Sequence, residues 1–357
     1  MSLSRWGWNS YLEAMWNETD REDAVPARVV AQHRKGWRIA GTFGECLAEP
    51  SGKLRLAAEA GADWPAVGDW VSVQINGPCD LALVRAVLPR RSQFIRKAPG
   101  TRIEGQVIAA NVETALVISA LDGDVNPRRA ERYIAQCWEF GVRPVLILNK
   151  ADAREDAGEQ AAAMQSVALD LPVHVVSART GQGIEEVERL FLPGQTFVLL
   201  GSSGVGKSTL ANRLLGQSLQ KVNDVRANDG RGRHTTTTRE LFVLPGGALL
   251  IDTPGLRELQ LWNGEEGLAQ TFADIHLLAA GCRFTNCRHE TEPGCAVQAA
   301  VQVGTLNLAR LENHRKLIRE EEFLQRKTDP EARSDEKQRI KRLTREARKI
   351  YQHKKTS

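Results

Sequence analysis

Gly201-Ser-Ser-Gly-Val-Gly-Lys207-Ser208 is a glycine-rich stretch that matches the pattern G-x-x-x-x-G-K-[ST]. The apolar run before it, Phe197–Leu200, is typical of a buried strand, and residues 208–215 after it are predicted to be helical. A turn of this kind points backbone N–H groups at phosphates, with the lysine on the β- and γ-phosphates and the serine on Mg²⁺. The predicted phosphate-binding residues are Gly201, Ser202, Ser203, Gly204, Val205, Gly206, Lys207, Ser208 and Thr209. A single match also occurs by chance, so its meaning depends on the other motifs.

A second motif, Asp252-Thr-Pro-Gly255, follows the apolar run Ala248–Ile251. At the end of a strand, the Asp252 carboxylate can hold Mg²⁺ through water, and the Gly255 N–H can contact a terminal phosphate. The structural alternative is a simple β-turn, because Asp-Thr-Pro-Gly is good turn chemistry. We therefore predict Ser208 and Asp252 as magnesium-binding residues.

The sequence Asn149-Lys150-Ala-Asp152 follows a third apolar run, Val145–Leu148. An aspartate here can accept hydrogen bonds from both N1–H and the 2-amino group of guanine, a pair that adenine does not offer. A second base-contacting loop is predicted at Ser177, Ala178 and Arg179. An Asn-Lys pair alone could be an ordinary loop, but Asn149 and Asp152 together argue against a plain P-loop ATPase.

The order of these motifs along the chain is unusual. The guanine motif lies about fifty residues before the phosphate loop, whereas an ordinary GTPase has it well after. Ligands bind at the carboxyl ends of parallel strands, so such motifs can share one site in either order. The pattern indicates a circularly permuted α/β P-loop GTPase, with a predicted helix at 128–140.

The stretch Gly230–Thr238 (GRGRHTTTT) between the phosphate loop and Asp252 lacks apolar residues. We interpret it as a switch loop rather than a solvated linker, with Thr235 or Thr236 completing the Mg²⁺ shell when GTP is bound. Leu256 stands where many GTPases carry a water-orienting glutamine, which predicts slow intrinsic hydrolysis. Lys207 and His234 are the candidate catalytic residues, although an isolated loop histidine is often simply exposed to solvent.

Three of the six cysteines lie close together with a histidine, as Cys282, Cys287, His289 and Cys295. Three thiolates and one imidazole form a closed tetrahedral set, which suits one structural Zn²⁺ per chain and leaves no open position for catalysis. The alternatives are a chance cysteine-rich loop or a redox switch. Arg283 and Arg288 lie between the ligands and would present positive charge to a polyanion.

The first hundred residues contain five short runs of β type separated by Gly, Pro and Asp turn signals. These runs are Ala27–Ala31, Trp37–Ala40, Lys53–Ala58, Trp70–Ile75 and Leu81–Leu88. They predict a small barrel, for which an oligonucleotide-binding (OB) fold is the natural candidate. An SH3-like barrel or a dimerisation module is the alternative.

Positive charge is concentrated in the C-terminal tail. The chain carries a net charge of +4, but residues 337–357 hold nine Lys or Arg against the single acid Glu346. Apolar residues at helical spacing predict a basic amphipathic helix there. A second basic stretch runs from Arg85 to Arg102. Each could be a solvated face, but both together with the arginine-bearing cysteine loop favour RNA as a partner.

The N-terminal segment is rich in tryptophan, with Trp8, Leu12, Met15 and Trp16 at helical spacing. We expect this face to dock on the protein itself, with a partner contact as the alternative. Neither a run of eighteen apolar residues nor a signal peptide is found, so we expect a cytoplasmic protein with no membrane contact.

These patterns divide the chain into five expected parts. They are a helical extension (1–25), an OB-fold barrel (26–98), the permuted GTPase domain (99–262), a mostly α zinc-binding domain (263–330) with helical spacing at Leu308, Leu311 and Ile318, and a basic helix (331–357).

Taken together, the barrel, the permuted GTPase motifs with GRGRHTTTT and the cysteine–histidine cluster resemble the RsgA (YjeQ/YloQ) family of bacterial small-ribosomal-subunit-dependent GTPases. The resemblance covers nearly the whole chain from about Ala27. It implies a late-stage maturation factor that binds the small subunit near the decoding region, hydrolyses GTP there and leaves. It also makes His234 a candidate catalytic residue and is consistent with Leu256 in place of the usual glutamine.

The expected function is therefore a GTPase that is stimulated by the small ribosomal subunit and assists its late maturation. Its expected partners are that subunit with its rRNA, and GTP or GDP, and we expect a monomer. The alternative is a GTP-gated RNA-binding protein that acts on tRNA or mRNA, with hydrolysis incidental.

Overall fold

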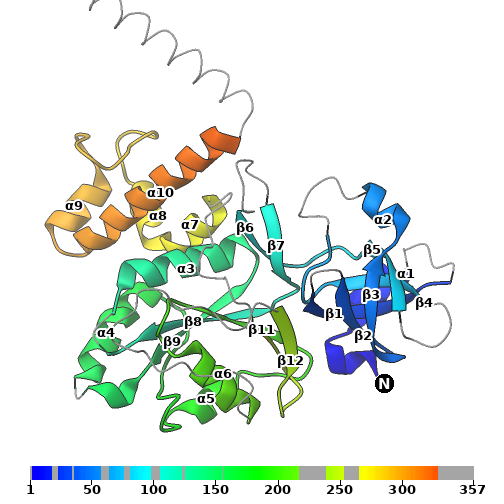
Figure 1. Ribbon diagram of the computed structural model, residues 1–357. Coiled ribbons are helices and arrows are strands. Elements are labelled where there is room, and N and C mark those ends of the chain that lie inside the picture. Colours follow the sequence, from blue (N-terminus) through cyan, green and yellow to red (C-terminus); the bar gives the residue numbers. More distant parts are fainter. Residues whose placement is uncertain are drawn as a thin grey trace, which may run out of the picture.

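The computed structural model in Figure 1 describes ten stretches of the chain. These are residues 2–17, 23–33, 36–57, 64–75, 81–97, 105–122, 125–154, 156–216, 239–252 and 265–328. The predicted switch loop with His234, Thr235 and Thr236, Gly255, Leu256 and the basic tail lie outside the described residues.

A closed five-stranded barrel forms the N-terminal domain. Its strands run in the order β1-β2-β3-β5-β4, and β4 pairs back onto β1. The pair β3–β5 is parallel and the other pairs are antiparallel. The strands are β1 (Val25–Gln32), β2 (Trp37–Gly41), β3 (Gly44–Pro50), β4 (Trp70–Ile75) and β5 (Leu81–Val87). The predicted barrel is confirmed.

One of the predicted barrel strands is wrong. The stretch Lys53–Ala58 was expected to be a strand, but its described part lies in helix α2 (Gly52–Ala57), and the third strand is instead β3 (Gly44–Pro50). The Ser51 hydroxyl accepts the Leu54 N–H at 3.2 Å and so caps the start of this helix. The alternation Leu54-Arg-Leu56 imitates a strand, but only Leu54 is buried, which is what a short surface helix requires.

The central domain is a mainly parallel sheet in the order β10-β9-β8-β11-β13-β12, in which only the β12–β13 pair is antiparallel. Its strands are β8 (Thr114–Ala120), β9 (Arg143–Asn149), β10 (Val173–Val175), β11 (Thr196–Leu200), β12 (Arg239–Val243) and β13 (Leu249–Asp252). Its helices are α3 (Pro127–Glu139), α4 (Ala157–Ala168), α5 (Ile184–Glu188) and α6 (Lys207–Leu215), and η2 (Ala151–Ala153) is a short 3-10 turn. The inner strands β8, β9, β11 and β13 are buried on both faces, as expected of a parallel sheet covered by helices, whereas the edge strands β10 and β12 are only partly buried.

The barrel and the central sheet are joined edge to edge. Strand β1 pairs antiparallel with β12 through Ala31 opposite Glu240 and Gln32 opposite Arg239, and the Arg38 guanidinium pairs with the Glu240 carboxylate. A separate hairpin of β6 (Gln93–Lys97) and β7 (Gly105–Ala110) leads from the barrel into the sheet.

The N-terminal segment folds back onto the barrel. It forms a 3-10 turn, η1 (Leu3–Trp6), and helix α1 (Ser10–Asn17). Leu12 and Trp16 are buried, and the Trp8 ring lies edge-on to Trp70 of β4, with ring centroids 4.7 Å apart. The expectation that this face docks on the protein itself is therefore confirmed.

Four helices follow the central sheet, shown in yellow and orange in Figure 1, and two of them, α7 and α10, pack against α3. They are α7 (Glu265–Thr271), α8 (Ala273–Ala279), α9 (Ala296–Gln302) and α10 (Leu308–Thr328). Their core contains Phe272, Ile275, Val297 and Leu311. The helices predicted at 128–140 and around Leu308 are both found. Among the described residues, no helix is long and apolar enough to cross a bilayer.

Arg28 of β1 connects three parts of the chain. It is 2% exposed, and its guanidinium donates to the Trp6 carbonyl at 2.8 Å, the Asn111 carbonyl at 3.3 Å and the Thr196 hydroxyl at 3.0 Å. Burial lowers its pKa to about 10, so it remains charged at neutral pH. The N-terminal segment, the barrel and the first residue of β11 are thus held by one side chain.

We expect Arg28→Met to destabilise the protein by about 2–4 kcal/mol, because three acceptors lose a charged donor in a buried place. Thermal unfolding should begin several degrees lower. The matched control is Arg55→Met in the exposed face of α2, for which a surface change of about 0.5 kcal/mol or less is expected. Equal melting temperatures for the two variants would contradict this prediction.

Candidate nucleotide-binding site and metal centre

The predicted phosphate loop lies between β11 and α6, and its glycines are structurally required. Gly201, Gly204 and Gly206 have φ values of 146°, 80° and 96°, in the range that favours glycine. A Cβ on Gly206 would lie 2.3 Å from the Asn149 amide nitrogen, and one on Gly201 would lie 2.5 Å from the Ile118 carbonyl oxygen. The loop therefore packs against the ends of the neighbouring strands with no room for a side chain at Gly201 or Gly206, whereas Gly204 is favoured by its backbone conformation alone.

Lys207 begins α6 and folds back over this loop. Its ammonium group donates to the carbonyl oxygens of Gly201 at 2.7 Å and Ser202 at 2.5 Å. Ser208 and Thr209 follow in the first turn of the helix. This places a positive charge and a helix N-terminus together at the loop, the arrangement that binds phosphate.

Asn149 ties the phosphate loop to the predicted base-reading loop. Its buried side chain donates from Nδ2 to the Val205 carbonyl at 2.8 Å and accepts the Ala178 N–H at Oδ1 at 2.9 Å. One side chain at the end of β9 thus fixes the distance between two loops that are far apart in the sequence. Its observed role is to hold these loops in place.

Asp152 is oriented by the second loop of the pair. The Ser177 hydroxyl donates to its Oδ1 at 2.5 Å, and the Arg179 guanidinium lies 3.9 Å from its Oδ2. The Ser177 oxygen in turn accepts the Thr180 N–H at 3.1 Å. Lys150, which lies between Asn149 and Asp152 in the sequence, has a left-handed backbone conformation (φ 66°). Its ammonium group pairs with the carboxylate of Asp122, which follows β8.

Two residues that support this site were not found by sequence reasoning. Arg213 of α6 donates to the carbonyls of Ala178 at 3.3 Å and Arg179 at 2.8 Å, and Asp122 pairs with Lys150. Asp122 follows the apolar run of β8, a strand-end position that could have indicated it. Arg213 had no such signal, because its partners lie about 35 residues away.

Asp252 is the last residue of β13, which runs parallel to β11 with Ile251 opposite Val198. It therefore lies at the same sheet edge as the phosphate loop, and its side chain is half-buried. A carboxylate and the Ser208 hydroxyl at one edge supply the oxygen ligands that Mg²⁺ prefers. The remaining predicted ligands, Thr235 and Thr236, are outside the described residues.

The predicted zinc ligands are gathered into one cluster. The Cys282 and Cys295 sulfurs are 3.9 Å apart, and His289 Nδ1 lies 3.6 Å from the first and 3.4 Å from the second. The four ligand atoms, including the Cys287 sulfur, all lie within 4.8 Å of one another. Zn–S bonds of about 2.3 Å in a tetrahedron place sulfurs about 3.8 Å apart, so the cluster fits this ion. The sulfur separation is far too long for a disulfide.

The loop that carries these ligands is braced by polar contacts. Gln298 of α9 donates to the His289 carbonyl at 2.5 Å, and His289 has left-handed backbone (φ 60°). The Glu292 carboxylate accepts the N–H groups of Arg288 and Glu290 at 2.8 Å each. These backbone hydrogen bonds hold the pKa of Glu292 at about 2.

The thiols of the cluster differ in their acidity. Burial opposes ionisation of Cys282, but N–H groups of Val297 and Ala296 at the start of α9 outweigh it and lower its pKa. Burial, together with the thiols of Cys295 and Cys282, raises the pKa of Cys287 to about 11. Thiols this close cannot all ionise unless a cation lies among them, which again suits a metal ion.

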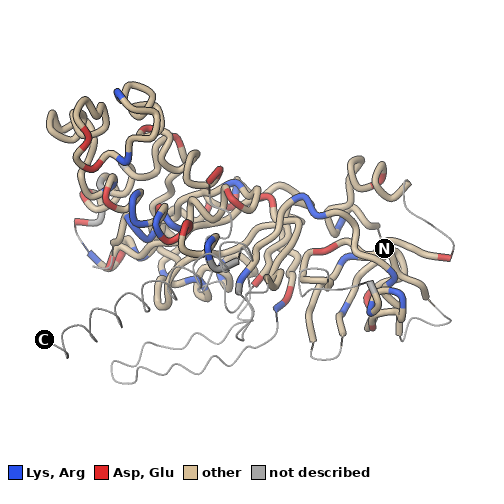
Figure 2. The backbone as a smooth tube through the Cα atoms, turned by 90° about the horizontal axis from the view of Figure 1, so that it is seen from above, with Lys and Arg blue, Asp and Glu red and all other residues tan. Residues whose placement is uncertain are grey.

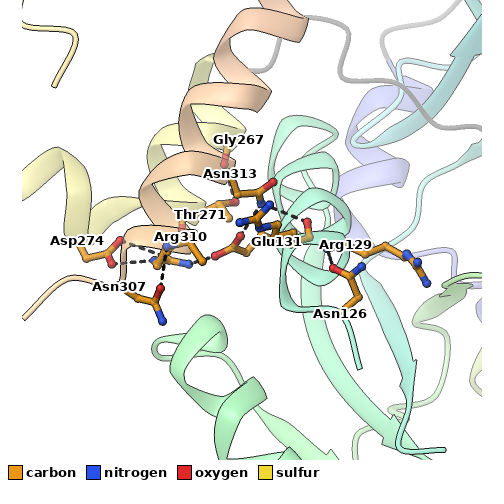
Figure 3. Close-up of polar contacts among 11 residues, drawn as sticks. Asn126, Arg129, Glu131, Gly267, Thr271, Asp274, Asn307, Arg310 and Asn313 are labelled. Atoms are coloured by element: carbon orange, nitrogen blue, oxygen red, sulfur yellow. Dashed lines mark hydrogen bonds and ion pairs between the residues drawn. The ribbon is translucent and has the colours of Figure 1, made fainter. Parts of the chain in front are cut away.

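A buried polar network attaches the C-terminal helices to α3, as Figure 3 shows. Arg310 of α10 donates to Glu131 of α3 at 2.6 Å and to both carboxylate oxygens of Asp274, at 2.8 and 2.9 Å. Asn313 donates to the other Glu131 oxygen at 2.5 Å. Burial opposes the charge of Arg310, but the two carboxylates outweigh it and raise its pKa.

The basic stretch Arg85–Arg102 is used partly inside the protein. Arg90 forms a two-pronged ion pair with the fully buried Asp69, at 2.8 and 2.7 Å, and Arg85 donates to Gln74 at 2.9 Å. Figure 2 shows Lys and Arg interspersed with Asp and Glu along the described chain. This stretch therefore offers fewer cations to a polyanion than the sequence count suggests.

Comparisons with known proteins agree with this architecture. The sequence model of the RsgA GTPase family matches residues 87–262. The chain is 42% identical to the small ribosomal subunit biogenesis GTPase RsgA of Opitutus terrae, over 96% of each chain. It is 44% identical to the protein of the same name from Streptomyces avermitilis, over 93% of this chain and 89% of that one.

Two solved structures share the fold. The crystal structure of YjeQ from Thermotoga maritima is similar with a TM-score of 0.64 and 25% identity, over 84% of this chain and 98% of that one. YloQ, described as a circularly permuted GTPase, gives a TM-score of 0.62 at 20% identity, over 85% of this chain and 97% of that one. With its permuted motifs at one sheet edge, this chain is a GTP hydrolase and belongs to the RsgA GTPase family.

Proposed function

We propose that this GTPase binds the small ribosomal subunit, hydrolyses GTP to GDP and phosphate with stimulation by the subunit, assists its late maturation and then dissociates. The observation that carries the proposal is the pair of curated relatives above, each named a small ribosomal subunit biogenesis GTPase and each aligned over most of this chain. The proposed partners are thus the subunit and its rRNA, and the proposed setting is the cytoplasm, with the protein acting as a monomer.

The proposed roles of the nucleotide-site residues follow from their positions. Lys207 and the backbone of residues 201–209 hold the phosphates, Asp152 reads guanine, and Ser177, Ala178 and Arg179 form the wall beside the base. Bound Mg²⁺ would supply charge neutralisation between the phosphates, and Ser208, Asp252 and Thr235 or Thr236 would hold it. Gly255 would contact the γ-phosphate, and His234 would act on the attacking water.

We propose that three parts of the chain bind RNA, and we call them together the RNA grip. They are the barrel (26–98), the zinc-binding domain (263–330) and the basic helix (331–357). In the metal-bearing loop, the exposed Arg283 guanidinium lies 5.6 Å from the centroid of the Phe284 ring, which is 41% exposed. An exposed aromatic ring beside a cation is suited to stacking on bases and contacting phosphates. GTP hydrolysis in the GTPase domain (99–262) would determine when the protein leaves the subunit.

Guanine specificity is expected to depend on Asp152. Asp152→Asn exchanges an acceptor for a donor and should weaken GTP binding by about 2 kcal/mol, or roughly thirtyfold, while favouring xanthosine nucleotides. Titration with labelled GTP and XTP measures both effects. The control is Asp156→Asn, an exposed carboxylate paired with Arg154. Unchanged GTP affinity in the Asp152 variant would remove the base-reading assignment.

The cysteine cluster is expected to hold one Zn²⁺ per chain. Cys287→Ala should lose the metal and loosen residues 281–295, because three ligands no longer close the tetrahedron. GTP binding should survive. Elemental analysis and proteolysis of the loop provide the measurement, with Cys46→Ala in the barrel core as the control that keeps its zinc. Freshly purified protein without zinc would contradict this assignment.

Subunit stimulation is the direct test of the proposed function. Alone, the protein should hydrolyse GTP slowly, and purified small subunits, but not free tRNA, should accelerate it. Lys207→Ala should abolish hydrolysis in both conditions. Deletion of 337–357 should leave intrinsic turnover intact and reduce stimulation most at raised salt, since lost phosphate contacts weaken a salt-dependent interaction.

Further outcomes of the same assay separate the proposed parts. His234→Ala should still co-sediment with subunits in a non-hydrolysable GTP analogue but lose most of the stimulated rate. Stimulation unchanged by the tail deletion at every salt concentration would move the RNA grip to the barrel and metal loop. Equal acceleration by tRNA and by subunits would overturn the proposed function.

A further inference from the structure

We propose that Arg129 is a catalytic residue of this site: an arginine supplied in cis from α3 that contacts the γ-phosphate of GTP and stabilises the charge that develops there. The proposal rests on the assignment of residues 201–208 as the phosphate loop. It adds a residue that the motifs of the sequence do not include.

The first observation is the contact between Arg129 and the loop. Arg129 Nη1 donates to the Ser202 hydroxyl at 3.0 Å, and the Ser202 carbonyl accepts the Lys207 ammonium at 2.5 Å. Two cations from different helices therefore converge on one residue of the phosphate loop. An anion bound at this loop, such as a nucleotide phosphate, would be attracted by both cations.

The second observation is how the start of α3 aims this side chain. The Asn126 side chain accepts the Arg129 N–H at 3.1 Å, and Pro127 occupies the first turn, so the helix begins at a defined residue. Figure 3 shows the Arg129 side chain directed away from the Glu131–Arg310 network. Its guanidinium is therefore directed to the nucleotide side, whereas its neighbours serve the C-terminal helices.

α3 is held in place from the other side, mainly by Glu131. Arg128 pairs with Glu312 at 2.9 Å and Arg132 pairs with Glu320 at 2.5 Å, both on α10, but the Arg128 pair is about half exposed and contributes little. Glu131 accepts the buried Arg310 and Asn313. Removing one partner from such a buried network is costly, so α3 cannot shift along α10 without losing it. The position of Arg129 relative to the loop is thus set by the packing of the C-terminal helices.

The chemistry needs a charge at this place. In hydrolysis, a water oxygen forms a bond to the γ-phosphorus while the bond to the β,γ-bridging oxygen breaks. The electron pair of that bond stays on GDP, and the water proton ends on phosphate or solvent. Negative charge is spread over the γ-oxygens during the transfer, and an arginine that meets it can accelerate the reaction about 10³- to 10⁵-fold. Leu256 cannot orient water as a glutamine would, which leaves charge stabilisation as the larger contribution.

Arg129→Ala in the full-length chain tests the proposal, with Arg128→Ala as the matched control one residue away, where the side chain is exposed and paired at the surface. We expect Arg129→Ala to keep GDP affinity within about twofold of the parent. Single-turnover GTP hydrolysis and the affinity for GDP with aluminium fluoride should each fall at least about tenfold. Arg129→Lys should recover part of the loss, since it keeps the charge but not the fork of donors.

Two results would overturn the proposal. One is a hydrolysis rate in Arg129→Ala that equals that of Arg128→Ala. The other is an equal loss of GDP and of the aluminium fluoride complex, which would mean that Arg129 only supports the loop. Lys207→Ala separates the assumptions: if that variant loses nucleotide while Arg129→Ala does not lose rate, only the Arg129 inference fails. If Lys207→Ala also binds and hydrolyses GTP normally, the phosphate-loop assignment fails, and the Arg129 inference fails with it.

Discussion

The Asn149 amide is the contact on which the nucleotide site depends. It binds the phosphate loop through the Val205 carbonyl and the base-side loop through the Ala178 N–H. This contact is possible because β8, β9, β11 and β13 run parallel and end at one edge of the sheet. The order of strands in space fixes the site, whereas their order in the chain is free. A circular permutation therefore moves the chain ends without moving the chemistry.

The permutation also determines what lies beside the site. The chain enters the central sheet from the barrel and leaves it into the C-terminal helices, and both attached domains contact the GTPase domain. Strand β1 of the barrel pairs with β12, which follows the predicted switch loop in sequence and neighbours the strand of Asp252. Helix α10 is locked to α3 through Arg310 and Glu131. Under the proposed function, RNA bound by the barrel would act on β12, which pairs with the strand that carries Asp252. RNA bound by the C-terminal helices would act on α3.

Sequence reasoning succeeded for strand ends and clusters that define a local pattern. The ends of β9, β11 and β13 were predicted because an apolar run stops at Asn149, Gly201 and Asp252, and the cysteine cluster because its ligand types suit one ion. It failed where a local signal was ambiguous, as with the Leu54-Arg-Leu56 alternation that is really a capped helix. It also failed for contacts between distant segments. The sequence shows that Arg28, Arg90 and Arg213 are basic. It does not show that each forms a hydrogen bond or ion pair with another residue of the same chain.

The buried network between α3 and α10 has a thermodynamic consequence for any coupling between RNA and nucleotide. A buried ion pair adds little net stability compared with apolar packing, but a shift of one helix that separates the pair would leave a buried charge without its partner, at a large cost in free energy. If RNA at the C-terminal helices favours the position of α3 that suits bound GTP, then GTP must strengthen RNA binding by the same factor. Loss of the γ-phosphate on hydrolysis would remove that gain. Under the proposed function, binding in the GTP state and release in the GDP state would both follow from this one coupling free energy.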